Sequence, residues 1–164
     1  ICGATALAVM PYVSQNLGAK NPKRACRSVG LGILITVCIG SVLGAASALF
    51  SRQLSSIMTD DPEVIMWSRQ KMVIISSTYF IYGINQIMSA TMRSMGKPVV
   101  PTITTLIFLC ALRFAWVYFV YPLIPNLAFL YLVWPIGWAL SAFTLWLGFN
   151  PTAKKLKSAA PTMV

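Results

Sequence analysis

Residues 28–50, SVGLGILITVCIGSVLGAASALF, form a run of 23 residues without a charged side chain. As an α-helix, with a rise of about 1.5 Å per residue, this run is about 34 Å long. The hydrocarbon core of a bilayer is about 30 Å thick, so a run of this length and composition predicts a helix that crosses a membrane.

Three runs of the same kind follow it, and a shorter one precedes it. Two of the later runs carry no charge, and the third is interrupted only by Arg113. The chain opens on Ile1 inside an uncharged run without an initiator Met, which we interpret as truncation within a helix. We therefore predict an all-α, polytopic transmembrane helical bundle over residues 1–149, with a partial span at about 1–19, full spans at about 28–50, 72–92, 99–121 and 127–149, and a tail at 150–164.

The overall composition supports a membrane protein rather than a soluble domain. Hydrophobic residues make up 57% of the chain and charged residues only 10%, whereas soluble domains carry about 25% charged residues. A formal net charge of +10 on a soluble protein would suggest nucleic acid as a partner. Because the basic residues here sit between apolar runs, we expect the lipid bilayer as the partner and no nucleic acid.

The distribution of basic residues predicts the topology. The first connector, the third connector and the tail together hold nine Lys and Arg residues, and the other two connectors hold three. By the positive-inside rule, the nine lie on the cytoplasmic side. We therefore expect a multi-pass protein of the cell (inner) membrane with a cytoplasmic C-terminus. The basic residues on that side are Lys20, Lys23, Arg24, Arg27, Arg93, Lys97, Lys154, Lys155 and Lys157.

The residues that most enzymes and metal sites need are missing. The chain has no His, its four cysteines show no CxxC spacing, and its three acidic residues all fall in one connector. No catalytic triad, paired carboxylates in a span or glycine-rich phosphate loop can be assembled. We therefore predict no enzyme activity, no metal site and no cofactor.

Several residues should shape the helices. Asp61 and Pro62 resemble the start of a helix that would run from Pro62 to Met92, 31 residues or about 46 Å. That length exceeds the membrane core, so this helix should protrude or tilt. Pro11 and Pro135 lie inside spans, where they either mark a moving segment or form an ordinary packing kink.

Small residues in the second span predict a close helix contact. Gly40 and Gly44 form a GxxxG motif, and Ala48 continues the small face one turn later. Such faces let helix backbones approach each other in membranes, so we interpret this one as a packing surface.

Polar residues recur on one face of the third full span. Asn and Gln amides in hydrocarbon face the bundle interior, because they need partners there. A cavity lined by amides, a Tyr ring and a Met could hold an organic cation; equally, the amides could form interhelical hydrogen bonds with no ligand. The residues at helical spacing are Thr78, Tyr82, Asn85, Ser89 and Met92, with Gln86 beside them.

Arg113 is the single charge inside a span. An unpaired Arg at that depth costs at least about 2.5 kcal/mol. It should therefore face protein, water or a carboxylate, or reach out to the interface. Since no acidic residue lies in any span of this chain, a carboxylate partner would have to come from the part that is missing.

Two segments next to the spans resemble a known family. SQNLGAKNPKRA, residues 14–25, resembles the Q-x-x-G-A-x-(D/N)-x-x-x-A signature of the multidrug and toxic compound extrusion (MATE) transporters. MRSMGKP, residues 92–98, resembles their L-R-G-x-G-K-(T/P) segment, with Met92 and Ser94 as departures. The matching positions are Gln15, Gly18, Ala19, Arg93, Gly96 and Lys97.

Helix physics gives these motif residues structural roles. Gln15 can cap a helix end, and Gly18 allows a tight exit from the first span. Gly96 is expected to be the C-terminal cap of the third full span, with Pro98 stopping it.

The resemblance implies a function and a place in a larger protein. MATE proteins have twelve spans in two lobes, and this chain would run from the end of the eighth span to the twelfth. They are secondary active antiporters that export organic cations and other toxic compounds in exchange for Na⁺ or H⁺. The resemblance therefore implies small amphipathic organic cations as substrates, and a missing N-terminal lobe as a partner.

The coupling site is where this chain departs from some members of the family. They carry an acidic residue in the tenth span, whereas this chain has only Asn85 and Gln86 there. The coupling acid is therefore expected in the missing N-terminal part.

Two other functions fit the sequence less well. A lipid-linked saccharide flippase of the related exporter superfamily would offer several cationic residues in the spans, and only Arg113 is present. A non-transporting membrane anchor subunit would need neither the polar face nor the kinked spans.

Overall fold

The computed structural model describes residues 2–123 and 126–159, with residues 151–159 described by their backbone alone. Helices account for almost all of these residues, and none of them lies in a strand. The elements are α1 Cys2–Gly18, α2 Pro22–Leu49, α3 Ser51–Ser56, α4 Pro62–Ser77, α5 Tyr79–Ser94, α6 Val99–Thr105, the π-helical η1 Leu106–Ala111, α7 Leu112–Ala115, the π-helical η2 Trp116–Val120, α8 Leu127–Tyr131 and α9 Val133–Ala159.

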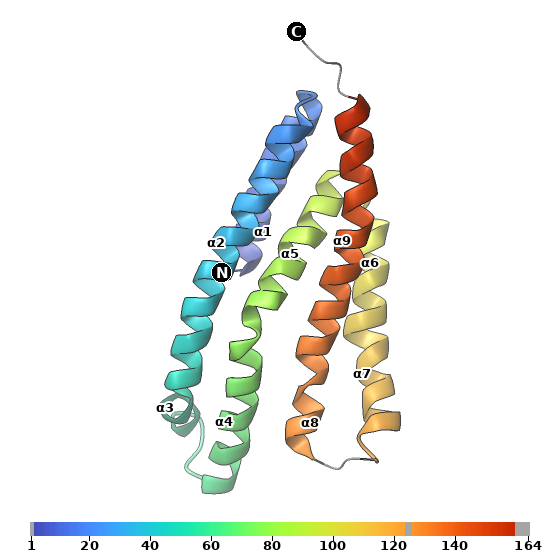
Figure 1. Ribbon diagram of the computed structural model, residues 1–164. Helices are drawn as coiled ribbons and strands as arrows, with labels where there is room; N and C mark the ends of the chain where they lie inside the picture. The colour runs from blue at the N-terminus through green and yellow to red at the C-terminus, as the bar shows by residue number, and fades with distance from the viewer. Residues whose placement is uncertain (1, 124–125, 160–164) are drawn as a thin grey trace.

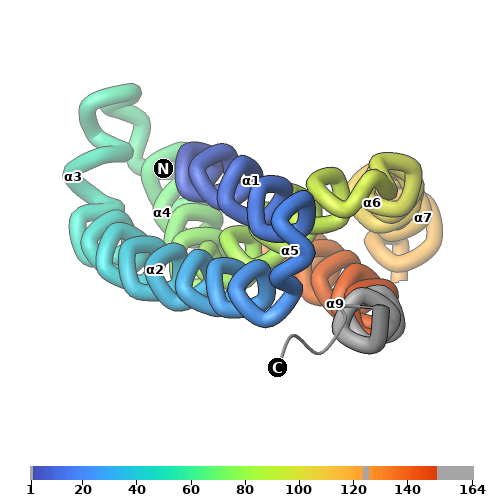
Figure 2. The backbone as a smooth tube through the Cα atoms, turned by 90° about the horizontal axis from the view of Figure 1, so that it is seen from above, coloured from blue at the N-terminus to red at the C-terminus, as the bar shows by residue number. Residues whose placement is uncertain are grey.

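The long helices lie side by side and run up and down along a common direction (Figure 1). The α1–α2 turn, the α5–α6 turn and the end of α9 lie at one end of the bundle, and α3, the loop before α4 and the start of α8 lie at the other. Viewed along the bundle, α5 lies between α1 and α2 on one side and α9 on the other (Figure 2). This arrangement confirms the predicted all-α membrane bundle.

Three helical stretches among the described residues are long and apolar enough to cross a membrane, and they are Pro22–Leu49, Val99–Val120 and Leu127–Asn150. They correspond to three of the predicted spans. The prediction of one continuous helix from Pro62 to Met92 was wrong, because the chain divides it into α4 and α5.

Thr78 is the point of division. Its backbone, at φ −107° and ψ 6°, leaves the helical region. Its hydroxyl donates to the carbonyl oxygens of Ile74 at 2.9 Å and Ile75 at 3.1 Å. A side chain that bonds its own preceding turn competes with the main-chain ladder and bends a helix.

The two prolines inside spans have different outcomes. α1 runs through Pro11 without a break. In the last span the helix is interrupted at Leu132, and Pro135 lacks the N–H that would otherwise bond the carbonyl of Tyr131. α9 continues past the predicted start of the tail at 150 as far as Ala159, and residues 160–164 lie outside the described part.

The core lies where α1, α2, α5 and α9 meet. Its side chains are apolar and nearly free of solvent, as for Val13, Ile87 and Leu145, each 0% exposed. Gly44 confirms the predicted close packing of the GxxxG face, because a methyl group there would collide with the carbonyl oxygen of Ser76 in α4. Gly40 sits against the backbone of Phe80 in α5.

The helix ends near the two motif segments are each followed by a residue with a left-handed backbone. After α5, Gly96 takes φ +74° while its N–H bonds the Arg93 carbonyl and the Lys97 N–H bonds the Met92 carbonyl, both at 3.0 Å. This pattern is a Schellman cap, and it confirms the predicted C-cap at Gly96. After α1, the left-handed residue is Lys20 (φ 54°) and not Gly18, so the predicted role of Gly18 was wrong.

Candidate functional site

The polar face of α5 divides between two environments. Asn85 and Ser89 are buried, with 5% and 3% of their surfaces exposed. The amide of Asn85 donates to the carbonyl oxygen of Trp138 in α9 at 3.4 Å, and the Ser89 hydroxyl donates to Asn85 Oδ1 at 3.4 Å. Asn85 therefore joins α5 to α9, as the interhelical interpretation of the face expects, and Ser89 holds the Asn85 side chain from within α5.

Tyr82 and Gln86 lie at the edge of the same contact and are only half-buried. The Gln86 amide donates to the Tyr82 hydroxyl. The ring of Tyr82 lies 5.2 Å from that of Trp138 and 5.3 Å from that of Tyr79, measured between centroids. Tyr79 meets Trp138 edge-on, with centroids 6.2 Å apart. We call Tyr79, Tyr82, Gln86 and Trp138 the aromatic–amide cluster.

The two remaining residues of the predicted polar face, Thr78 and Met92, belong to neither of these groups. Thr78 forms the break between α4 and α5, directly before the aromatic–amide cluster. Met92 is 1% exposed and belongs to the apolar core with Leu145. The helix direction therefore changes directly before the first turn of α5, which carries the rings of Tyr79 and Tyr82.

Arg113 lies in α7, between the two π-helical segments. Its guanidinium carbon is 4.8 Å from the centroid of the Trp134 ring, and the Nζ of Lys71 in α4 is 5.7 Å from the same centroid. Cation–π contact therefore supplies the protein partner that Arg113 needs at this depth. No carboxylate pairs with it within the described part of the chain. We call Lys71, Arg113 and Trp134 the cation–indole cluster.

The motif residues gather at the end of the bundle that holds the α1–α2 and α5–α6 turns (Figure 1). The side chain of Gln15 is exposed and makes no capping bond to any described residue; its main-chain carbonyl accepts the Ala19 N–H at 2.9 Å. The expectation that the Gln15 side chain caps this end was therefore wrong. Arg93 and Lys97 are exposed around the Gly96 turn.

Most of the bundle matches a known protein family. The MatE family profile matches residues 3–119, from the start of α1 through most of η2. The chain belongs to the MatE family. It is therefore part of a membrane protein of a transporter family and not an enzyme.

Curated relatives of this MatE chain include transport and resistance proteins from distant organisms. The chain is 30% identical over 100 residues to the probable multidrug resistance protein YoeA of Bacillus subtilis. It is 27% identical over 95 residues to an FAD transporter of Shewanella oneidensis. It is 35% identical over 89 residues to protein DETOXIFICATION 41 of Arabidopsis thaliana. These alignments cover 61%, 58% and 54% of this chain. They cover only 22%, 21% and 18% of the relatives, so the chain matches about a fifth of their length.

Sequence reasoning found half of the aromatic–amide cluster of this MatE chain and one residue of the cation–indole cluster. It missed Tyr79, Trp138, Trp134 and Lys71. The two tryptophans are four residues apart, so they lie one helical turn from each other on one face. That spacing in the last span was a usable signal.

The side chains described in this MatE bundle offer groups for noncovalent recognition. No group of three or more His, Cys, Asp or Glu side chains able to hold a metal ion occurs among the described residues. The described spans offer ring faces, the amides of Asn85 and Gln86, hydroxyls and the guanidinium of Arg113. Such groups suit an amphipathic ligand with a flat or cationic part.

Proposed function

We propose that the full-length protein is a secondary active efflux antiporter that exports small amphipathic organic cations in exchange for Na⁺ or H⁺. The observation that carries this proposal is the aromatic–amide cluster, on a broken helix of a MatE-family bundle. Three rings within 6.2 Å of one another and a half-buried amide form a patch without a fixed negative charge.

Ring faces attract an organic cation through their quadrupoles, by about 0.5–2 kcal/mol per well-placed contact. A patch built from rings binds many cations of similar shape without discriminating among them, which suits a multidrug substrate range. The described spans contain no acidic residue, so the carboxylate that would couple transport to Na⁺ or H⁺ is proposed to lie in the N-terminal lobe.

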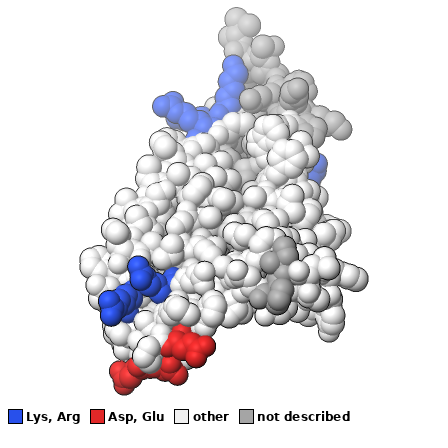
Figure 3. Space-filling model, turned by 60° about the horizontal axis from the view of Figure 1, so that its bottom comes forward, with Lys and Arg blue, Asp and Glu red and all other residues white. Residues whose placement is uncertain are grey.

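The topology remains part of this proposal. The two basic turns and the C-terminal end of α9 share one end of the bundle (Figure 1). The acidic residues lie with a few basic ones at the opposite end (Figure 3). Under the positive-inside rule this supports a cell-membrane protein whose C-terminus is cytoplasmic.

A second substrate class is favoured by the cation–indole cluster. Lys71 and Arg113 bring two positive charges to one indole ring, and a relative carries the name FAD transporter. An aromatic anion of the flavin nucleotide type would be attracted to this cluster. Transport assays in the same cells, with a cationic dye and with FAD, test the two substrate classes.

The test uses the full-length gene in a host without its main efflux pumps. Cells expressing it should accumulate less of the cationic dye ethidium, and dissipating the ion gradient should abolish the difference. Tyr82→Ala should raise dye accumulation towards the level of cells without the gene. Phe143→Ala should not, because Phe143 belongs to an exposed ring pair on α9 outside the aromatic–amide cluster.

Equal dye accumulation with and without the gene would refute the cation proposal. Export of FAD that fails in Arg113→Leu and persists in Tyr82→Ala would instead establish the second substrate class.

A further inference from the structure

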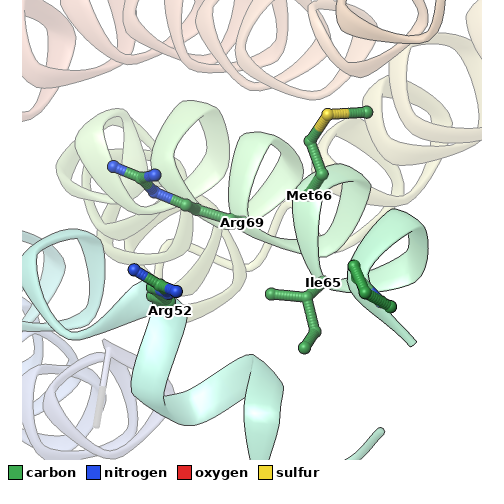
Figure 4. Close-up of a pocket in the computed structure, with 5 residues that line it drawn as sticks. Arg52, Ile65, Met66 and Arg69 are labelled. Atoms are coloured by element: carbon green, nitrogen blue, oxygen red, sulfur yellow. The ribbon is translucent and has the colours of Figure 1, made fainter. Parts of the chain in front are cut away.

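A pocket of about 330 Å³ lies between α3 and α4, at the end of the bundle opposite the motif turns. Its volume is at the lower end of the range of about 300–1,000 Å³ that is typical of small-ligand sites. One side carries two guanidinium groups and the rest is apolar (Figure 4). The lining residues are Arg52, Pro62, Ile65, Met66 and Arg69.

The two guanidinium groups are not neutralised by a neighbouring acid. Within the described residues, no carboxylate forms an ion pair with Arg52 or Arg69, although three acidic side chains are close in the sequence. One of these, Asp61, accepts the Glu63 N–H at 2.9 Å and so faces the start of its own helix. Two like charges brought to one pocket repel each other, and an anion bound between them would remove that repulsion.

The position of α3 places this pocket at the level of lipid head groups. α3 starts directly after the membrane-crossing stretch of α2 ends at Leu49. Ser55 of α3 is held against α4 by a 3.1 Å hydrogen bond to Ser68. Just beyond α3, Ile57 and Met58 are 80% and 87% exposed, and such apolar side chains next to a span are suited to the acyl boundary.

We propose that this pocket binds the phosphate of an anionic phospholipid head group. Arg52 and Arg69 would donate charge-assisted hydrogen bonds to the phosphate oxygens, a contact for which the planar guanidinium is well shaped. Ile65 and Met66 would contact the glycerol and the first acyl carbons. The apolar side of the pocket is the reason for choosing a lipid over free phosphate, which would gain nothing from it.

The experiment uses the full-length transporter purified in detergent, titrated with short-chain phosphatidylglycerol while its thermal unfolding midpoint is followed. The midpoint should rise with phosphatidylglycerol and much less with short-chain phosphatidylcholine, whose head group is neutral overall. Because a hydrogen bond to a charged group contributes about 1.5–3 kcal/mol, Arg52→Gln and Arg69→Gln should each weaken the apparent affinity by about tenfold or more. Lys23→Gln is the control, since it removes one exposed positive charge outside the pocket lining and outside both clusters.

The outcomes separate the possible sources of phosphate. Inorganic phosphate that fails to compete with phosphatidylglycerol supports the lipid, whereas inorganic phosphate that binds as tightly as the lipid overturns it. Equal weakening by Lys23→Gln and by the two pocket variants would overturn the site as well, because binding would then follow only the net charge of the protein. Retained binding in the Arg52→Gln/Arg69→Gln double variant would do the same.

Discussion

Gly44→Ala should destabilise the bundle, because the new methyl group has no room. At this position the neighbouring atom is the main-chain carbonyl oxygen of Ser76, which cannot rotate away as a side chain could. α2 and α4 would therefore have to move apart, next to the break at Thr78. Overpacking of this kind costs about 1–3 kcal/mol.

An opposing gain has to be subtracted from that cost. Ala is favoured over Gly inside a helix by about 1 kcal/mol. A collision with a rigid main-chain oxygen is placed in the upper part of the overpacking range, about 2–3 kcal/mol. After the helix gain of about 1 kcal/mol is subtracted, Gly44→Ala should lower the free energy of unfolding by about 1–2 kcal/mol. At Gly30 in the same helix, no atom lies within 4 Å of an added methyl group. Gly30→Ala should therefore show only the stabilisation that comes from the higher helix propensity of Ala.

The measurement is the thermal unfolding midpoint of the purified full-length protein and of both variants in the same detergent. Gly44→Ala should melt below the unmodified protein, and Gly30→Ala at or above it. A Gly44→Ala midpoint equal to that of Gly30→Ala would refute the argument, because the contact with Ser76 would then carry no energy.

Three further predictions concern the two clusters and the caps. Asn85→Leu should cost roughly 0.6 kcal/mol of stability, the average for a polar contact between membrane helices. Gln86→Leu should leave the melting temperature unchanged and alter the range of exported dyes. An equal loss of stability in the two variants would contradict this prediction. Arg113→Leu should lower transport activity while Arg113→Lys retains part of it, because Lys can still contact the indole; unchanged folding and transport in Arg113→Leu would sink the idea that this charge is used. Gly96→Ala should cost about 1 kcal/mol of stability, because Ala is strained at φ +74°, while Gly18→Ala, which has open space and an ordinary φ, should be neutral when both are compared by thermal unfolding.

The helical class and the main spans could be predicted because hydrocarbon imposes a length and a composition on each crossing. The cap at Gly96 was equally predictable, since few residues adopt a left-handed backbone. The break at Thr78 was not, because a threonine in an apolar run is compatible with both a straight and a bent helix. The bend accompanies hydrogen bonds from its hydroxyl to the carbonyls of Ile74 and Ile75, which the sequence alone does not specify.

The candidate site was predicted only in part for a similar reason. Helical spacing placed Tyr82, Asn85 and Gln86 near one another, but it could not say which of them would meet α9. The structure buries Asn85 against Trp138 and leaves Gln86 at the edge. Likewise, periodicity identified Arg113 as a charge in need of a partner, and only the tertiary arrangement shows that the partner is the ring of Trp134.

The break at Thr78 also has a mechanical consequence. α4 has most of its neighbours in α2, α3 and α8, whereas α5 has most of its neighbours in α1, α2 and α9. A rotation at the break would therefore change the contacts of one half while leaving most contacts of the other half intact. This one crossing is therefore made of two helices joined at Thr78, and most of the contacts at one end of the bundle are separate from those at the other end.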